Sequence, residues 1–305
     1  MHDILSILFL TFAATLRVAT PLVLCAMGGL FSEKSGIIDV GLEGKMLIAA
    51  FFAAATSAVT GSAWLGVAAA IVAAEVLALL HGFACITHRG NQVVSGVAIN
   101  ILAAGLTVVL GTAWFARGGQ TPALPPEARF MPVEWLGGHN ILVWAAILAV
   151  PLTHWIVNQT RFGLRLRAVG EMPLAVDAAG VSVAWLRYRA TVICGLFTGV
   201  AGAYLALAQN AGFSRDMTAG QGYIALAAMI VGKWRPLPAL GACLMFGLLD
   251  AVAIRLQGVR LALLGEIPVQ FIQVLPYALT VILLAGFIGR AVAPKAIGIP
   301  YEKVH

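Results

Sequence analysis

Three charged residues interrupt an otherwise apolar stretch near the N-terminus. Asp39, Glu43 and Lys45 stand among glycines in GIIDVGLEGKMLI, residues 36–48. Carboxylates in such a place would serve ion coupling in a transporter driven by protons or sodium. The Gly44-Lys45 pair lacks the earlier glycine and the following Ser or Thr of a phosphate-binding loop. We therefore expect no nucleotide site here, and the sequence shows no catalytic or metal-binding constellation.

Neutral amides form a second group with useful chemistry. Asn100 lies in the apolar run GVAINIL, while Gln209 and Asn210 open the stretch QNAGFSRDMTAGQGYIALAAMIVG, residues 209–232. An amide donates and accepts hydrogen bonds without needing a counter-charge. These side chains are therefore suited to hold a weakly polar solute inside an apolar protein.

Two further ionisable residues, Arg17 and Glu75, lie in the middle of apolar runs. A charge at the centre of a bilayer is costly and usually faces the protein interior. We expect an ion pair between them that holds two helices in register, and a role toward the substrate is the alternative.

The composition assigns these residues to a membrane protein. Of the 305 residues, 61% are hydrophobic and only 10% are charged, and the mean hydropathy is +0.94. Soluble domains average about 45–50% apolar and about 25% charged residues. The apolar runs are continuous, without the alternation of a membrane β-barrel. We therefore predict an all-α, polytopic membrane protein, and we expect no binding of nucleic acid despite the net charge of +6.

The apolar runs set the number of helices. A crossing takes roughly 20 apolar residues, so the chain has room for about eight to ten transmembrane helices in one domain, residues 1–305. The runs lie at about 4–30, 46–60, 63–86, 92–115, 140–158, 184–208, 221–231, 237–256 and 269–289. Two longer connections separate them, a Pro/Gly-rich loop at 116–139 and a basic segment at 159–183.

The distribution of Lys and Arg predicts the orientation, because these residues are retained on the cytoplasmic side. With 159–183 in the cytoplasm, eleven basic residues lie inside and four outside, and the C-terminus is cytoplasmic. The loop 116–139 is then external. The side of the N-terminus depends on whether residues 37–60 cross the membrane or only dip into it, and the sequence leaves both possibilities open.

The two interrupted segments, 36–48 and 209–224, predict the position of a solute path. Transporters often consist of related halves whose broken or re-entrant helices meet near the midplane, and unwound backbone at that depth must face protein or water. We expect the two segments to face each other near Asn100. Two ordinary interfacial loops are the alternative.

The basic segment RFGLRLRAVGEMPLAVDAAGVSV, residues 161–183, predicts a short helix that begins near Pro173 and ends near Gly180. Such a helix could fit a groove on a soluble protein. A basic loop resting on anionic headgroups is the alternative.

Several motifs resemble one known family. They are TLRVATPL at 15–22, LFSEKSGIIDVGLEGKMLIAAF at 30–51, SGVAINILAAGLT at 95–107, the 161–183 segment, MTAGQGYIALAAMIVGKWRP at 217–236 and PKAIGIPYEK at 294–303. Together they resemble the shorter permease of the nucleoside-type (basic membrane protein-associated) ABC importers, and more distantly the ribose and branched-chain amino acid permeases. The sequence departs from that pattern at Asp39 and Lys45, where Asn and a neutral residue are expected.

The resemblance implies a non-catalytic permease subunit in the bacterial inner membrane, working by alternating access. Its expected partners are a second, longer permease in a heterodimer, a cytoplasmic ATPase that binds ATP and Mg²⁺, an extracytoplasmic binding protein or lipoprotein, and membrane lipid. The expected substrate is a nucleoside or similar solute; riboflavin, a free base, a sugar or a branched-chain amino acid are alternatives.

The resemblance places the ATPase contact in the 161–183 segment, and the chemistry and position of other residues give candidates for the substrate path and for docking of the binding protein. Those expected to contact the ATPase are Arg161, Arg165, Arg167, Glu171, Ala175, Asp177 and Gly180. Those expected to line the substrate path are Asp39, Glu43, Asn100, Gln209 and Asn210. Arg117 and Arg129, in the external loop, are expected to meet acidic residues of the binding protein.

Overall fold

A computed structural model describes residues 2–256, 260–261, 265–266, 274, 278, 282 and 292–303. Within these residues, seven helices are long and apolar enough to cross a membrane. The long helices are α1 (His2–Lys34), α2 (Leu42–Thr60), α3 (Ala63–Gly82), α4 (Gln92–Phe115), α5 (Ile141–Gln159), α8 (Val183–Tyr204) and α10 (Pro236–Leu256).

Shorter elements connect or extend them. These are the π-helical turns η1 (Phe83–Thr87) and η4 (Leu205–Gln209), the 3-10 turns η2 (Pro126–Ala128) and η3 (Glu134–Leu136), the helices α6 (Arg161–Glu171), α7 (Pro173–Ala178) and α9 (Gln221–Val231), and the two-residue strands β1 (Arg260–Leu261) and β2 (Gly265–Glu266). The two strands pair antiparallel.

Polar residues beside the apolar runs fix where several helices begin. The side chains of Ser62, Asn91, Asn140 and Ser182 accept hydrogen bonds from the first-turn N–H groups of α3, α4, α5 and α8. These N–H groups have no partner within the helix. Each cap therefore starts a helix at the edge of its apolar run.

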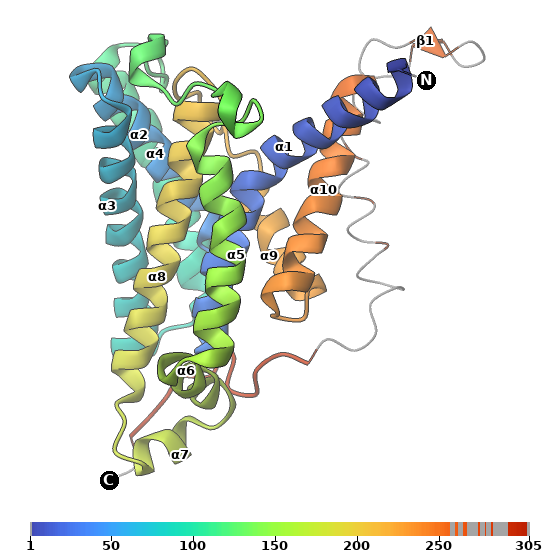
Figure 1. Ribbon diagram of the computed structural model, residues 1–305. Helices are drawn as coiled ribbons and strands as arrows, with labels where there is room; N and C mark the ends of the chain where they lie inside the picture. The colour runs from blue at the N-terminus through green and yellow to red at the C-terminus, as the bar shows by residue number, and fades with distance from the viewer. Residues whose placement is uncertain are drawn as a thin grey trace.

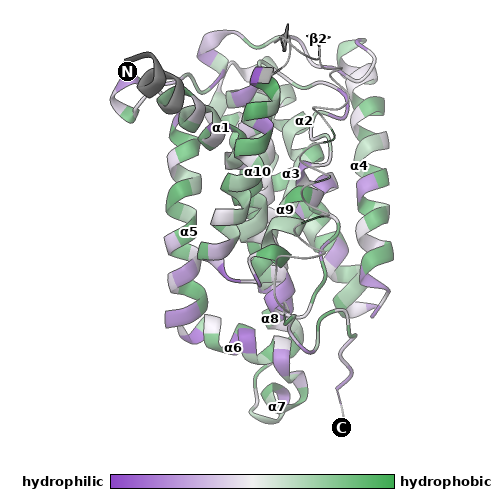
Figure 2. Cartoon of the chain, turned by 90° about the vertical axis from the view of Figure 1, so that its right-hand side faces the viewer, coloured by the Kyte–Doolittle hydropathy of each residue, from purple (hydrophilic) through white to green (hydrophobic). Residues whose placement is uncertain are grey.

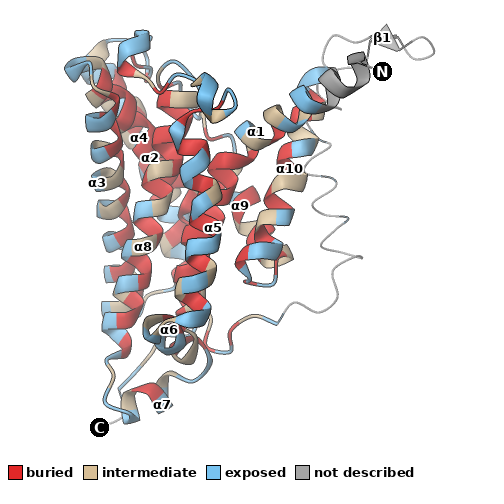
Figure 3. Cartoon of the chain, viewed as in Figure 1, coloured by how far each residue is buried: buried red, intermediate tan, exposed pale blue. Residues whose placement is uncertain are grey.

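Three helices form the centre of the bundle: α1, α2 and α8, which packs against both of the others. α1 packs against α8, α10, α9 and α5, while α2 packs against α3, α8 and α4. Buried residues concentrate on α2 and on the second half of α1, whereas α3, α4 and α5 carry many exposed residues along their length (Figure 3). The exposed faces of these outer helices are mostly apolar (Figure 2), as expected for a surface in contact with lipid.

The bundle has two distinct ends (Figure 1). We call the end with α6 and α7 the α7 end, and the end with residues 116–139 the loop end. At the α7 end, the N–H groups of Ala296 and Gly298 donate to the carbonyls of Gly170 and Gly36. At the loop end, Ser57 of α2 donates to the carbonyl of Ala128.

These observations confirm the all-α, polytopic fold. Seven long helices and the short α9 match the predicted runs in order, and the predicted run 269–289 lies outside the described residues except for positions 274, 278 and 282. α2 extends to the loop end, so residues 37–60 do not merely dip into the bundle. α1 begins at the loop end, opposite α6 and α7.

Candidate functional site

The first interrupted segment is a short unwound stretch between α1 and α2, residues 35–41. There Lys45 donates to the carboxylate of Asp39, and both side chains are fully buried. The thiol of Cys194 donates to the same carboxylate at 3.2 Å. His81 holds the neighbouring backbone, with its Nε2 2.9 Å from the carbonyl oxygen of Ile38. Asp39 and Lys45, the two positions at which a departure from related permeases is expected, are therefore partners in one buried ion pair.

The pair expected between Arg17 and Glu75 is absent from the described part of the chain. Arg17 is exposed on α1, and its carbonyl accepts a hydrogen bond from the hydroxyl of Tyr204. Glu75 lies against α8, where a Cβ at Gly195 would come within 2.8 Å of its carboxylate.

The second interrupted segment, residues 210–220, leads from η4 back into the bundle to the start of α9. The carboxylate of Glu43 accepts hydrogen bonds from the N–H groups of Gly220 at 2.8 Å and Gly222 at 2.6 Å. Anions are favoured at a helix N-terminus, so Glu43 caps α9 from the start of α2. A Cβ at Gly222 would lie 2.5 Å from the backbone nitrogen of Glu43, so this contact requires glycine.

Asn100 joins the same place from α4. Its amide accepts a hydrogen bond from the N–H of Gly44 at 2.8 Å and donates to the carbonyl of Val40 at 3.0 Å and to the hydroxyl of Tyr223 at 2.7 Å. Asn100 thus connects the start of α2 to the start of α9. The expected meeting of the two interrupted segments beside Asn100 is confirmed.

A cavity of about 320 Å³ lies where the three elements meet. Its lining residues are Glu43, Gly44, Leu47, Val97, Asn100, Ile101, Ala104, Asp216, Thr218, Ala219, Gly220 and Tyr223. The walls are apolar side chains of α2 and α4, and the polar groups come from the second helix break, the first turns of α2 and α9, and Asn100 of α4. Such a site suits a small solute that is held by a few hydrogen bonds and apolar contact.

The structure places only some of the predicted path residues at the cavity. Glu43 and Asn100 line the cavity, whereas Asp39 is fully buried with Lys45 and is not among the lining residues. Gln209 and Asn210 are exposed near the loop end, where the adjoining Ala211 carbonyl accepts from the N–H of Leu124. We expected these two amides near the midplane, and this expectation is wrong. η4 continues α8 to the loop end, and the chain turns back into the bundle only after Asn210.

Sequence reasoning missed Tyr223, Asp216 and Thr218 as lining residues. Tyr223 is 45% exposed and directs its hydroxyl to Asn100. Its position directly after Gly222, at the start of a short helix, was the available signal. Asp216 and Ala219 have φ values of +53° and +44°, which no pattern in the sequence predicts.

The basic segment forms two helices at the α7 end. α6 carries Arg161, Arg165 and Glu171 exposed and Arg167 partly buried, so the residues before the predicted short helix are helical as well. α7 begins with Pro173 at its first position, as predicted, and ends before Gly180, whose φ is +77°. Exposed residues of this part include Ala175, Leu174 at 55% and Met172 at 61%, while Asp177 is half-buried.

The Pro/Gly-rich loop covers the other end. It is fixed to η4 and to the chain after it, because the N–H groups of Phe130 and Thr121 donate to the carbonyls of Leu207 and Phe213. Arg117 is exposed, and Arg129 is partly buried with its guanidinium 3.4 Å from the sulfur of Met131. In the described residues, no group of three or more His, Cys, Asp or Glu side chains is placed to hold a metal ion.

Comparison with known proteins agrees with this architecture. Residues 11–284 match the family described as branched-chain amino acid transport system / permease component. The chain is 41% identical to the guanosine ABC transporter permease protein NupQ of Bacillus subtilis and 36% identical to the nucleoside ABC transporter permease protein NupC of Lactococcus lactis, over 99% of each chain. It is 26% identical to the L-arabinose transport system permease protein AraH of Escherichia coli, over 68% of this chain and 61% of that protein. The chain is a multi-pass membrane protein that belongs to this family of transport-system permease components.

Proposed function

We propose that this chain is one permease subunit of an ABC importer for nucleosides in the bacterial inner membrane. The observation that carries the proposal is the cavity between the two helix breaks, lined by Glu43, Asn100 and Tyr223. The relatives named for guanosine and for nucleosides, which match over the whole chain, support the choice of solute.

The chemistry of the cavity fits a nucleoside. A ribose needs hydrogen-bond partners, and a base needs a flat apolar or aromatic contact. Stacking of a base on an aromatic side chain contributes about 1–3 kcal/mol, and the ring of Tyr223 is partly exposed beside the cavity. Asn100 holds the Tyr223 hydroxyl and therefore orients that ring. A solute delivered by a binding protein needs only a weak site, since tight binding would slow its release.

A second permease would complete the path. α4 is the least buried of the seven long helices, with 22% of its apolar window buried, against 39–72% for the others. Val97 and Ile101 line the cavity from this helix and are 42% and 69% exposed. A second, longer permease packed on α4 would cover these residues and supply the opposite wall of the path.

The α7 end would face the cytoplasm and receive the ATPase. The basic side chains of α6, together with the exposed Ala175 and Leu174, offer a charged and apolar surface beyond the long helices (Figure 1). ATP and Mg²⁺ would bind to the ATPase, and closure of its two copies would push α7. The C-terminus is then cytoplasmic, and the loop end with Arg117 and Arg129 would receive the binding protein.

Uptake of radiolabelled guanosine by cells that carry the complete importer tests this function. We expect uptake to be saturable, to be lost on ATP depletion and to persist when the ion gradient is collapsed. Unlabelled nucleosides should compete, and L-arabinose should not. Competition by arabinose alone would assign a sugar, and uptake that follows the ion gradient would assign a secondary transporter.

The role of the cavity is tested separately with Tyr223. Tyr223→Ala removes the ring and should lower guanosine uptake by about tenfold or more, since loss of stacking costs about 1–3 kcal/mol. Tyr223→Phe keeps the ring and should retain most uptake. Val109→Ala, at a 63% exposed site on α4 outside the cavity lining, is the control. Equal uptake by Tyr223→Ala and the control would rule out this path.

A further inference from the structure

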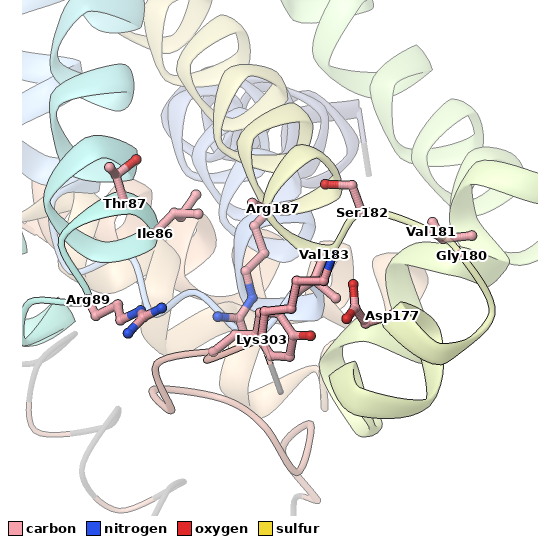
Figure 4. Close-up of a pocket in the computed structure, with 12 residues that line it drawn as sticks. Ile86, Thr87, Arg89, Asp177, Gly180, Val181, Ser182, Val183, Arg187 and Lys303 are labelled. Carbon is pink, nitrogen blue, oxygen red and sulfur yellow. The ribbon is translucent and has the colours of Figure 1, made fainter. Parts of the chain in front are cut away.

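A second cavity lies at the α7 end, away from the solute path. Its volume is about 390 Å³, and it lies among the end of η1, the stretch from α7 to the start of α8, and the C-terminal tail (Figure 4). Its lining residues are Ile86, Thr87, Arg89, Asp177, Gly180, Val181, Ser182, Val183, Ala184, Arg187, Tyr301 and Lys303. The lining thus combines three cationic side chains with one carboxylate.

Arg187 is the central group of this cavity. Its side chain is 1% exposed, and it donates from Nε to the carbonyl of Ser35 at 3.1 Å and from Nη1 to the carbonyl of Ile299 at 3.3 Å. Its Nη2 is buried and has no hydrogen-bond partner among the described residues. A buried donor without a partner is costly, and a guanidinium is the side chain best suited to bind an oxyanion through several donors.

The surroundings of Arg187 favour a negative charge. Arg89 and Lys303 line the cavity from two other segments, and both are exposed. Arg89 is partly neutralised by Glu302, whose carboxylate lies 2.8 Å away. The first residues of α8, Val183 and Ala184, also line the cavity. Their N–H groups belong to the positive end of a long helix, where anions bind readily.

Asp177 opposes these groups, because its carboxylate lines the same cavity. With Glu302 counted as the partner of Arg89, three cations and a helix N-terminus still outweigh two carboxylates. The volume exceeds what a water molecule or a small ion needs, since a water molecule occupies about 30 Å³ in the liquid. A phosphate group attached to a larger body fits both the charge and the space.

We propose that this cavity binds a phosphate group, presented by a small phosphorylated metabolite such as a nucleoside monophosphate or by the headgroup of an anionic phospholipid. Both sources offer the same oxyanion to Arg187 and the same negative charge to Lys303 and Arg89. The proposal is independent of the transported solute, because the two cavities share no lining residue.

Equilibrium binding to the full chain, purified in neutral detergent without the ATPase, tests the proposal. Without the ATPase, the chain itself must supply any site that binds a nucleotide. The soluble arm uses radiolabelled guanosine monophosphate and inorganic phosphate in the presence of excess unlabelled guanosine, which lacks a phosphate and fills the solute path. The lipid arm reconstitutes the chain in nanodiscs of phosphatidylcholine with or without phosphatidylglycerol, and measures by mass spectrometry the phosphatidylglycerol that stays bound after delipidation.

We expect saturable binding of one phosphate-bearing probe and no binding of guanosine to this site. Arg187→Gln should weaken binding at least about tenfold, since a hydrogen bond to a charged group contributes about 1.5–3 kcal/mol. Lys303→Gln changes an exposed residue, leaves folding intact and should weaken binding up to about fivefold, since an exposed charge pair contributes about 0.2–1 kcal/mol. Arg215→Gln, at an exposed cation near the other cavity, is the matched control and should change nothing.

Retention of phosphatidylglycerol with no binding of the soluble probes would assign the lipid source, and the reverse would assign the metabolite. Absence of saturable binding in both arms would overturn the proposal. Undiminished binding by both Lys303→Gln and a folded Arg187→Gln would overturn it as well, because the phosphate would then bind elsewhere on the chain.

Discussion

The buried pair of Lys45 and Asp39 should behave as one unit. Both side chains are fully buried, and each neutralises the other. Asp39→Asn leaves the ammonium of Lys45 without its counter-charge, and Lys45→Met leaves the carboxylate of Asp39 in the same condition. Changing both residues removes the two charges together and restores neutral side chains at positions where related permeases are expected to carry them.

The expected magnitudes differ sharply between the single and double changes. Breaking a buried ion pair by removing one partner costs about 3–5 kcal/mol, whereas replacing both partners by neutral groups of similar volume is often neutral or stabilising by about 1–4 kcal/mol. Each single variant should therefore lower the free energy of unfolding by at least about 3 kcal/mol, which is more than a hundredfold in the equilibrium constant. The double variant should be at least as stable as the parent protein. Methionine fits the site because it is unbranched and flexible.

The free energy of unfolding is measured for the parent protein, the two single variants and the double variant. Each purified protein is unfolded by SDS titration in mixed micelles, and unfolding is followed by tryptophan fluorescence. The exposed pair Arg89–Glu302 is the matched control, because its side chains are 49% and 73% exposed. Exposed pairs typically contribute only about 0.2–1 kcal/mol. The corresponding cycle of Arg89→Gln and Glu302→Gln should therefore show almost no coupling.

A double variant as unstable as the sum of the two single variants would refute this reasoning. It would mean that each residue stabilises the protein through other contacts, such as the thiol of Cys194 on Asp39. A stable double variant that no longer transports guanosine would instead assign the pair a part in the transport cycle.

Three further predictions concern the solute path and the two ends. Asn100→Leu removes three hydrogen bonds between α4 and the two helix breaks, each worth about 1 kcal/mol. It should reduce guanosine uptake about tenfold or more. Co-purification with the partner subunits should show that assembly persists. Glu171→Arg, which reverses a charge on exposed α6, should abolish uptake without affecting membrane insertion, and cysteines placed at Ala175 and Asp177 should crosslink to the ATPase. Labelling of those cysteines only from outside the cell would contradict the orientation. Arg129→Glu should slow association with the binding protein about tenfold at low salt and much less at high salt; a salt-independent rate would remove Arg129 from the docking surface.

The helices could be predicted from the sequence because their signals are local. The run at 92–115 matches α4 (Gln92–Phe115), and the run at 221–231 matches α9 (Gln221–Val231). Asn91 caps the start of α4, and α9 lies between Gly220 and Gly232. Pro173 likewise predicted the start of α7, since its ring fits the first position of a helix.

The contacts of the site depended on tertiary packing and could be predicted only in part. Glycine-rich interruptions indicated where the breaks lie, and the expectation that they meet followed from the need to shield unwound backbone. Asp39 lies only six positions before its partner Lys45. The two side chains become buried only when α3 and α8 pack around the break. Gln209 was misplaced because a π-helical turn extends α8 by one more turn, and polarity alone does not reveal this.

The C-terminal tail has a consequence for the order in which the protein can be completed. The carbonyls of Ser35 and Gly36 receive their hydrogen bonds from Arg187 and Gly298, and Gly298 is synthesised about 260 residues after Gly36. At about 5–20 residues per second, the ribosome needs roughly 15–50 seconds to reach it. During that interval the connection between α1 and α2 remains open, and only the full-length chain can close it. A chain that ends before residue 294 would insert its helices and still leave this connection unfinished.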